Sequence, residues 1–581
     1  MPESVHPLVL RAREALARSE LKTAEQAVEE RLKMAGRDIN ALELRYLLQK
    51  HRGQMGEAAR TLDAVIGINS RADWAHNALL ELLIAHGKLG DAEQVARTAL
   101  RANPNNAEAH NHFGALMSGS GDLSAGEFHL RRALEIDGPK PAVLINLADN
   151  LRRQGRLEEA EGCLARAHEL APGDAKTLIS WAAVSEARGD LKRAGELINR
   201  AEAASSPEDV TLPRSNHLAR SGRHEEALAI LNSAKALTGE GQLARGRLHE
   251  QLGRYEEAWQ DLVAGKRKIA SDAGGLQYKP EAVEMLFGRW KPFFTRETMG
   301  KMPYAKPRKD VPQPVFILGF PRSGIALVEQ VICSHPGVAR GGELGLLPHL
   351  RQVVANSLPT QQPGGPMGQP VPVGDSLASR SVRGPMGQPG GRMGQPFPES
   401  LALSWTADQR HLGTVLRDAY LARAEHNVPL DSDRGFFTDR APLGELYLPL
   451  LKIAFPQAKI VYVTRHPLDI CVSMLSNHVT QGFNCAYRIE DTVHHLAAMF
   501  DLFQHYRREL DPGDYVVQYE ALIADPAGQA RKLFEYIGLP DDGRKPGGLH
   551  DRSLNRHRHY AQQLKPYRTR LQPLMTAFGY T

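Results

Sequence analysis

The pattern of apolar and polar positions changes near residue 270. Before it, small and apolar residues recur at helical spacing in short segments separated by polar turns, which predicts successive pairs of helices. One glycine stands in the turn of each pair, at intervals of 34, 34, 34, 34, 33 and 31 residues. These glycines are Gly53, Gly87, Gly121, Gly155, Gly189, Gly222 and Gly253. Such a period predicts similar helical units stacked along the chain, each burying its apolar face on the next.

A helix–turn–helix unit of about 34 residues is the signature of tetratricopeptide repeats. We therefore interpret residues 1–275 as a helical solenoid. Solenoids of this kind present a concave surface, and the usual use of that surface is to bind a peptide or a partner protein. The alternative is that the repeats serve only as an arm for dimerisation or for stabilising the rest of the chain.

From residue 315 onward, short apolar runs alternate with helical segments. The runs that predict buried strands are 315–318, 436–439, 458–464 and 515–518. Strands that alternate with helices predict a parallel sheet with helices on both faces. The predicted fold is therefore a helical solenoid followed by a P-loop-like α/β domain with a central parallel sheet. In such sheets, ligands bind at the carboxyl ends of the strands.

Two segments of different composition interrupt this pattern. Residues 276–314 are partly helical and then rich in proline and lysine, and we interpret them as the connection to a second domain at 315–581. Residues 358–398 contain GPMGQP twice and GRMGQP once. Because so few large apolar side chains cannot offset the entropy of ordering this segment, we predict a disordered insertion in the second domain. An amphipathic helix is predicted from Ser400 onward.

The glycine loop at 319–324 follows the first predicted strand and precedes a predicted helix at 325–333. This order places free backbone N–H groups and the positive end of a helix dipole against a phosphate, and Arg322 adds a positive charge. The loop lacks the Gly-Lys-[Ser/Thr] of nucleotide triphosphatases, which argues against ATP hydrolysis and against a nucleotide kinase. Arg440 and Arg465 follow two other predicted strands. We therefore expect the three arginines to converge on one phosphate-binding crevice.

Composition argues against several other classes of function. The net charge is +5 over 581 residues, which gives no reason to expect nucleic acid or an anionic membrane as a partner. No apolar segment has the length of a transmembrane helix or the character of a leader, so the expected setting is cytoplasmic. Neither metal-binding nor redox spacing relates the cysteines, which predicts reduced thiols and no metal site. The cysteines are Cys163, Cys333, Cys471 and Cys485.

Taken together, several segments resemble sulfotransferases that use 3′-phosphoadenosine-5′-phosphosulfate (PAPS). Residues 321–324 resemble the 5′-phosphosulfate loop of that family. The stretch from Arg465 to Ser473 resembles its 3′-phosphate motif, an arginine with a serine eight residues later. SHPGVARGGE, FTDRAP, VVQYEALIADP and the C-terminal SLNRHRHY are similar to further family segments. More narrowly, the chain resembles bacterial proteins that join tetratricopeptide repeats to a sulfotransferase domain, distant relatives of tyrosylprotein sulfotransferases.

The resemblance implies a role for each matching residue. Glu343 is the implied base for the acceptor proton, while Arg322 and Arg440 are implied to stabilise the charge on the leaving group. The residues implied in binding PAPS are Arg322, Ser323, Gly324, Ile325, Ala326, Arg465, Ser473, Tyr519 and Arg556. PAPS is implied as co-substrate, with no metal. The implied acceptor is a hydroxyl group on a substrate, such as a protein or peptide, that the repeats recruit.

The chain departs from the family pattern at several positions. Ile325 and Ala326 stand where the family usually has two threonines, so two side-chain hydroxyls are lost. At about 0.5–1.5 kcal/mol for each hydrogen bond, this predicts a cofactor affinity lower by on the order of ten- to a hundredfold. Arg440 replaces the usual lysine, and Asn555 and His557 replace a glycine and a tryptophan. Two interpretations follow, an active PAPS-dependent sulfotransferase and a non-catalytic repeat scaffold with a degenerate sulfotransferase domain.

Overall fold

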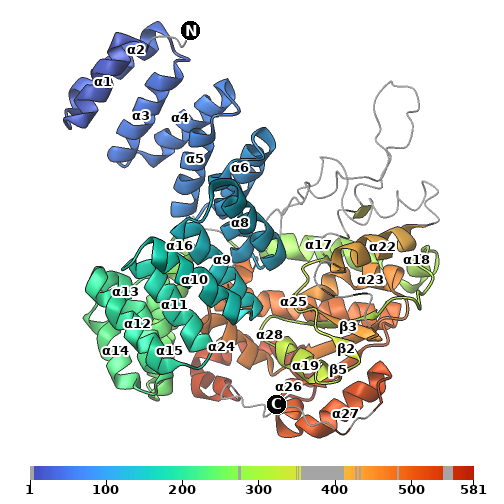
Figure 1. Ribbon diagram of the computed structural model, residues 1–581. Coiled ribbons are helices and arrows are strands. Elements are labelled where there is room, and N and C mark those ends of the chain that lie inside the picture. Colours follow the sequence, from blue (N-terminus) through green and yellow to red (C-terminus); the bar gives the residue numbers. More distant parts are fainter. Residues whose placement is uncertain are drawn as a thin grey trace, which may run out of the picture. The chain divides into compact units, whose positions relative to one another are not determined.

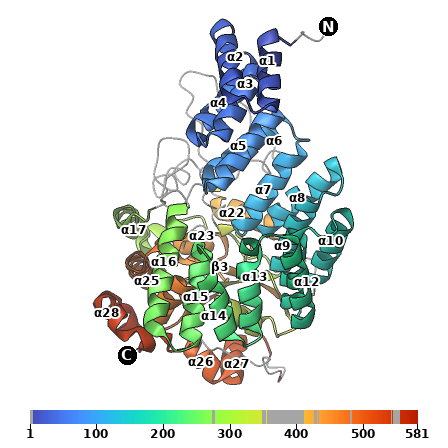
Figure 2. The same ribbon diagram turned by 90° about the vertical axis from the view of Figure 1, so that its left-hand side faces the viewer.

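The computed structural model describes residues 5–272, 277–347, 411–425, 433–479, 483–540 and 554–580, and the single positions 350, 353, 354, 428, 430 and 543. Contacts divide the chain into two compact units, and Figures 1 and 2 show their elements from two sides. The first unit holds residues 1–235 and 271–275, and the second holds residues 236–270 and 276–581. The insertion predicted at 358–398, and the first part of the helix predicted from Ser400, lie outside the described residues.

Paired helices build the described part of the first unit, as the repeat pattern predicts. The seven turn glycines all have φ angles between 68° and 91°, which explains their recurrence because residues with a Cβ rarely adopt this conformation. Ala58, Ala92 and Ala160 are fully buried in the solenoid core. The helices are α1 (Pro7–Ala17), α2 (Leu21–Met34), α3 (Ile39–His51), α4 (Met55–Ile68), α5 (Asp73–Ala85), α6 (Leu89–Ala102), α7 (Ala107–Gly119), α8 (Leu123–Asp137), α9 (Pro141–Gln154), α10 (Leu157–Leu170), α11 (Ala175–Ala187), α12 (Leu191–Ala204), α13 (Pro207–Arg220) and α14 (His224–Ser233).

The last helix pair in this repeating pattern groups with the second unit. This pair is α15 (Gly239–Gln251) and α16 (Tyr255–Asp272), of which all but the last two residues of α16 belong to the second unit. Leu243 and Leu262 of the pair form a buried apolar cluster with Leu475. The sequence pattern placed this pair with the repeats, whereas its contacts place it with the sheet-containing unit. A functional domain boundary near residue 275 stays a prediction.

A five-stranded sheet forms the centre of the second unit. Its strand order is β2–β3–β1–β4–β5, and all neighbouring strands are parallel. The four predicted strands are present, and among the described residues the pattern missed the two-residue edge strand β2. The strands are β1 (Gln313–Gly319), β2 (Val338–Ala339), β3 (Phe436–Pro442), β4 (Lys459–Thr464) and β5 (Tyr515–Gln518). The predicted solenoid followed by an α/β domain with a parallel sheet is confirmed.

Alternate residues of the central strand β1 contribute to two different cores. Val315 and Ile317 pack with α19 and α27, whereas Phe316 and Leu318 pack with α22, α23 and α25. Because both faces are covered, the strand is continuously apolar. The helices are α17 (Pro280–Phe293), α18 (Arg296–Gly300), α19 (Ile325–Ile332), α22 (Leu412–Ala424), η2 (Gly444–Tyr447), α23 (Leu448–Ala454), α24 (Pro467–Ser476), η3 (Asn484–Tyr487), α25 (Ile489–Leu510), α26 (Tyr519–Ala524), α27 (Pro526–Ile537), η4 (Arg556–Tyr560) and α28 (Ala561–Ala577). None of the described helices combines the length and the apolar character needed to cross a membrane.

The carboxyl group of Glu445, in η2, is buried inside the second unit. Its side chain is 1% exposed, and burial raises its pKa from 4.5 to about 7. Because the folded-state pKa is the higher one, the contribution of Glu445 to stability is full below pH 4.5 and is lost as the pH rises through about 7, at a cost of about 3 kcal/mol. We therefore expect Glu445→Gln to be more stable than the parent at pH 8 but not at pH 4.5. Urea unfolding at both pH values measures this difference, and an equal change in both proteins would contradict it.

Candidate functional site

Two glycines shape the loop that connects β1 to α19. A Cβ on Gly319 would lie 2.6 Å from the backbone oxygen of Val463, and one on Gly324 would lie 2.3 Å from the ring of Tyr519. Gly324 has a φ angle of 104° and precedes α19, where no described side chain caps the first turn. The loop therefore sets the amino end of a helix, with its backbone N–H groups, at the carboxyl edge of the sheet. This arrangement binds anions.

Side chains from three elements meet at this loop. The Nε of Arg322 donates a hydrogen bond of 3.0 Å to the Oγ of Ser473 in α24. Arg465, which follows β4, donates from Nη1 to the backbone oxygen of Arg322 at 3.4 Å, and its guanidinium lies 4.7 Å from the ring centroid of Tyr519. Ser473, Arg465 and Tyr519 are buried, whereas Arg322 is exposed. Four of the residues predicted to bind PAPS are thus brought together.

The remaining predicted loop residues differ in their surroundings. Ser323 is fully buried, and its hydroxyl has no hydrogen-bond partner among the described residues. A buried hydroxyl of this kind, next to the amino end of α19, fits a ligand that brings phosphate oxygens. Ile325 is buried in the apolar core beneath the loop, whereas Ala326 is exposed. Ile325, which stands at one of the two positions where the family usually has threonine, is therefore a core residue in this protein.

A buried carboxylate ties the C-terminal segment to the site. The Asp469 carboxylate in α24 accepts hydrogen bonds of 2.8 Å from the backbone nitrogens of Asn555 and His557 and from the His557 ring, and it lies 3.9 Å from Arg465. Burial tends to raise the pKa of Asp469, but the hydrogen bonds from His557 and the charge of Arg465 outweigh it and lower the pKa. The carboxylate therefore remains charged and holds the segment beside the arginine.

The structure pairs Arg556 with a glutamate from the last repeat-like helix pair. Its Nε and Nη2 donate to the two carboxylate oxygens of Glu250 at 2.7 and 2.6 Å. Nη2 also donates to the Oγ of Ser476, which lies in α24 like Ser473. Arg556, the first residue of η4, thus contacts the helix that also carries Ser473, but it already has a carboxylate partner. Its predicted contact with a 3′-phosphate stays a prediction.

A tight turn places Glu343 beside Arg440. A Cβ on Gly341 would lie 2.0 Å from the backbone oxygen of Thr438, and Gly342 has a φ angle of 70°, so both positions require glycine. The backbone N–H of Arg440 donates to the Gly342 oxygen at 2.8 Å. The Arg440 Nη1 then lies 3.5 Å from Glu343 Oε1, and the Glu343 side chain is 51% exposed. The predicted base is therefore open to solvent and next to a predicted arginine.

Glu329, in the middle of α19, is a site residue that the sequence pattern did not single out. Its carboxylate is buried, forms an ion pair with the Arg440 Nε at 2.8 Å, and accepts hydrogen bonds from the Thr438 hydroxyl and the Gly342 N–H. The available signal was a charged residue inside the apolar run of α19. That signal was weak, because the pattern alone does not say which side chain would pair with it.

These contacts form two groups at neighbouring strand ends. The first group lies beyond β1 and β4, and the second lies at β3, the other neighbour of β1. In the strand register Pro442 pairs with Gly319. Arg440 lies inside β3, two residues before its end, and not beyond a strand end as predicted. The register sets Arg322, Arg440 and Arg465 at one edge of the sheet, and a shared ligand crevice stays a prediction.

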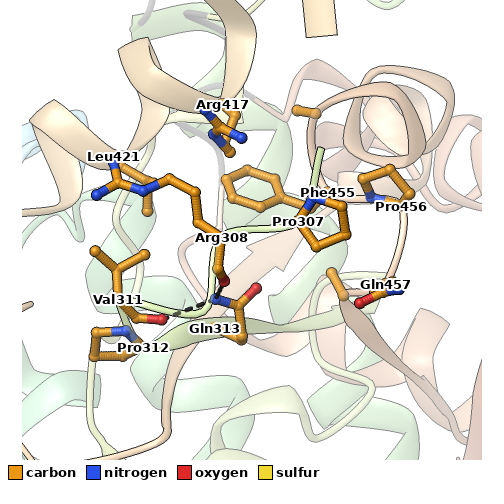
Figure 3. A pocket seen from close by; sticks show the side chains of 12 residues that line it. Pro307, Arg308, Val311, Pro312, Gln313, Arg417, Leu421, Phe455, Pro456 and Gln457 are labelled. Atoms are coloured by element: carbon orange, nitrogen blue, oxygen red, sulfur yellow. Dashed lines mark hydrogen bonds between the residues drawn. The ribbon is translucent and has the colours of Figure 1, made fainter. Parts of the chain in front are cut away.

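A small pocket lies at the opposite, amino-terminal edge of the sheet (Figure 3). Gln313, the first residue of β1, lines it together with Pro307, Pro312 and Phe455. The Gln313 amide donates to the backbone oxygens of Arg308 and Val311, as the dashed lines in Figure 3 show. The enclosed volume is about 10 Å³, roughly that of one water molecule. This pocket is therefore too small for a substrate.

Comparison with known proteins identifies the two parts of the chain. Residues 314–543 match the sulfotransferase family, and residues 141–174 match a tetratricopeptide repeat. The chain is a tetratricopeptide-repeat protein with a sulfotransferase family domain. The resemblance predicted from the sequence is confirmed at this level. The matched sulfotransferase segment includes the glycine loop, the Glu343 turn, β3, β4 and α24.

Known proteins are similar to parts of this chain. It is 24% identical over 397 residues to an uncharacterized protein of Aquifex aeolicus (strain VF5), a match that covers 66% of this chain and 46% of that protein. It is 30% identical over 119 residues to the omega-hydroxy-beta-dihydromenaquinone-9 sulfotransferase of Mycobacterium tuberculosis (strain CDC 1551 / Oshkosh), covering 17% of this chain and 28% of that enzyme. The chain thus spans less than half the length of these curated relatives.

Solved structures similar to the chain include repeat proteins. One is a tetratricopeptide repeat protein from Parabacteroides merdae, with 16% sequence identity and a TM-score of 0.37, covering 42% of this chain and 97% of that one. Another is PilW, a type IV pilus biogenesis factor, with 18% identity and a TM-score of 0.31, covering 34% of this chain and 91% of that one.

Proposed function

We propose that the protein is a PAPS-dependent sulfotransferase that moves a sulfonate group to an acceptor hydroxyl. The observation that carries the proposal is the contact of Arg322 with Ser473, and of Arg465 with the backbone of Arg322, beside the amino end of α19. Two guanidinium groups, a buried hydroxyl and a helix terminus at one sheet edge suit a ligand with phosphate groups at two positions. Membership of the domain in the sulfotransferase family supports sulfuryl transfer over other uses of such a ligand.

Each group of residues has a separate task in this proposal. Arg465 and Ser473 hold the 3′-phosphate by charge and hydroxyl, and the loop with Ser323 and the first N–H groups of α19 holds the 5′-phosphosulfate. Arg440 lies on the other side of the loop, at β3. Tyr519 packs against Gly324 and Arg465, so it fixes the loop and the guanidinium relative to each other. The residues present therefore fit PAPS as a co-substrate.

The proposed reaction is a displacement at the sulfur atom of PAPS. The acceptor oxygen attacks the sulfur, the bond from sulfur to the bridging oxygen breaks, and 3′,5′-adenosine bisphosphate leaves with the electron pair. Glu343 takes the proton of the acceptor hydroxyl. Its exposure lets an acceptor approach it, and Arg440 at 3.5 Å keeps a cation beside the reacting groups. Arg322 and Arg440 stabilise the negative charge that grows on the leaving phosphate.

The acceptor is proposed to be a hydroxyl on a protein or peptide. Tetratricopeptide repeats suggest protein–protein interaction, which supports recruitment of a macromolecular acceptor by the first unit. The name of the mycobacterial relative includes an omega-hydroxy substrate, which supports a hydroxyl as the accepting group.

Calorimetric titration with 3′,5′-adenosine bisphosphate, followed by a transfer assay, tests the proposal. We expect micromolar binding by the parent, and labelled sulfonate passing from PAPS to hydroxyl-containing peptides. Glu343→Gln is expected to bind the bisphosphate within about twofold of the parent but to lose on the order of a hundredfold or more in transfer rate. Glu297→Gln is the matched control, since Glu297 in α18 is an exposed carboxylate paired with Lys301 just after that helix. Unchanged transfer by Glu343→Gln would exclude this glutamate as the base.

One observation favours a second candidate, a non-catalytic repeat scaffold. Ile325 is a core residue and Ala326 carries no hydroxyl, so neither side chain can hydrogen-bond a phosphosulfate. In that case the parent would show no heat of binding with the bisphosphate at high protein concentration. The function would then lie in what the repeats bind.

A further inference from the structure

We propose that Glu329 is a positioning residue of the transfer site, which holds the Arg440 guanidinium and the turn before Glu343 in their working geometry. This inference rests on the proposed sulfotransferase function and names a residue to which neither the motifs nor the comparisons assign a role.

The geometry of the Glu329 carboxylate carries the proposal. The side chain is 2% exposed, and both of its oxygens have partners. Oε2 lies 2.8 Å from the Arg440 Nε, and Oε1 accepts hydrogen bonds of 2.7 Å from the Thr438 hydroxyl and 2.9 Å from the Gly342 N–H. One carboxylate on α19 therefore joins β3 to the turn that carries Glu343.

The contact orients Arg440 and does more than neutralise it. The pair is a charge contact at 2.8 Å, in which the Arg440 Nε makes no hydrogen bond within the described residues. Because a guanidinium is planar, a buried carboxylate against its Nε still restricts the directions that the two Nη groups can take. With Nε at Glu329, Nη1 lies 3.5 Å from Glu343, and Nη2 lies 3.9 Å from the position of a Cβ on Gly342. A lysine has a single rotatable ammonium group, so it could not contact Glu329 with one nitrogen and face Glu343 with another. Arg440, which replaces the usual lysine, is thus paired with a buried carboxylate, that of Glu329.

A purely structural role explains these contacts less well. A buried ion pair is often no more stabilising than apolar side chains of the same volume, because both charges must leave water. Glu329 lies in a helix that is apolar apart from the exposed Gln330, and its neighbours Val328 and Val331 are fully buried. Nor can Glu329 itself be the base, since it is buried and both oxygens are occupied. The position of the carboxylate makes sense if the placement of Arg440 matters for the reaction.

A double-mutant cycle on nucleotide binding tests the proposal. Affinities for PAPS and for 3′,5′-adenosine bisphosphate are measured by calorimetry for the parent, Glu329→Gln, Arg440→Ala and the double variant. We expect Glu329→Gln and Arg440→Ala each to weaken PAPS binding by about tenfold. Arg440→Ala removes the guanidinium that would bind the charged ligand, and Glu329→Gln removes the charge that holds this guanidinium in place. The double variant should be no weaker than Arg440→Ala, and bisphosphate binding should change less than PAPS binding. Losses that multiply in the double variant, or PAPS binding unchanged in Glu329→Gln, would overturn the proposal.

Matched variants separate positioning from folding. Glu445→Gln removes another buried carboxylate of the same unit, with no contact to Arg440 in the described residues, and should leave the PAPS affinity unchanged. Glu329→Asp keeps the charge but shortens the side chain by one carbon. It replaces Glu329→Gln in the binding measurement if that variant does not fold. We expect Glu329→Asp to lose PAPS affinity in the same direction, and an unchanged affinity would count against the inference.

The proposed function and this inference fail in different ways. If the parent binds neither nucleotide, the proposed function is wrong. Crystal structures of the parent and of Glu329→Gln then decide whether Glu329 positions Arg440. Displacement of the Arg440 guanidinium from Glu343 in the variant would support a positioning role for Glu329. An Arg440 that keeps its position without Glu329 would overturn it.

Discussion

A chain that begins at residue 276 is expected to lose its cooperative unfolding transition, whereas one that begins at residue 236 should fold and bind 3′,5′-adenosine bisphosphate. The shorter chain lacks α15 and α16, which belong to the second unit by their contacts. It therefore loses Glu250, the partner of Arg556, in an ion pair whose side chains are only 14–15% exposed. Removing one partner of a buried ion pair costs about 3–5 kcal/mol, which is a large part of the stability of a typical domain.

Further contacts of the same helix pair increase the expected loss. Arg247 donates to the backbone oxygen of Ser476, and Trp259 packs with its ring centroid 5.5 Å from that of Tyr560. Circular dichroism during heating, on both truncated chains at equal concentration, measures the difference. If residues 276–581 unfolded at the same temperature as residues 236–581, the second unit would be independent of the helix pair.

Arg465→Ala is expected to lower the affinity for 3′,5′-adenosine bisphosphate by at least a hundredfold. Arg465 is 4% exposed and contacts the glycine loop, Tyr519 and Asp469, so its guanidinium is held in place before any ligand arrives. Hydrogen bonds to charged groups contribute about 1.5–3 kcal/mol each, and two of them account for a hundredfold or more. The loop contact to the backbone oxygen of Arg322 is lost as well.

A second arginine gives a matched control for this measurement. Arg308 pairs with Asp310 near the amino-terminal edge of the sheet, where Figure 3 shows it beside Gln313, and Arg308→Ala should bind the bisphosphate like the parent. Calorimetric titration of both variants, with thermal unfolding to confirm that each is folded, provides the comparison. If both variants bound the bisphosphate with equal affinity, Arg465 would not be the residue that binds the 3′-phosphate.

Local patterns determined the parts of the fold that depend on near neighbours in the chain. The repeat was readable because each turn needs a residue with positive φ, and glycine fills this position seven times. The four long strands were readable because a sheet covered on both faces demands continuous apolar runs. The edge strand β2 was not, since two residues are too few to form a pattern. The glycine loop was readable because close backbone approaches exclude side chains there, whereas the segment that carries Glu343 was identified only through its resemblance to a family motif.

The partners of the charged side chains were settled only by the tertiary structure. Arg556 was assigned to a phosphate from its motif, yet its carboxylate partner Glu250 lies 306 residues earlier, in a helix pair that looks like any other repeat. Glu329 was passed over, yet it holds an arginine on a different element. An ion pair depends on where two elements pack and on how far water is excluded, and neither has a period along the chain. Local patterns were therefore enough for the repeats, the sheet and the glycine loop, whereas the packing of distant elements sets which charged side chains face each other.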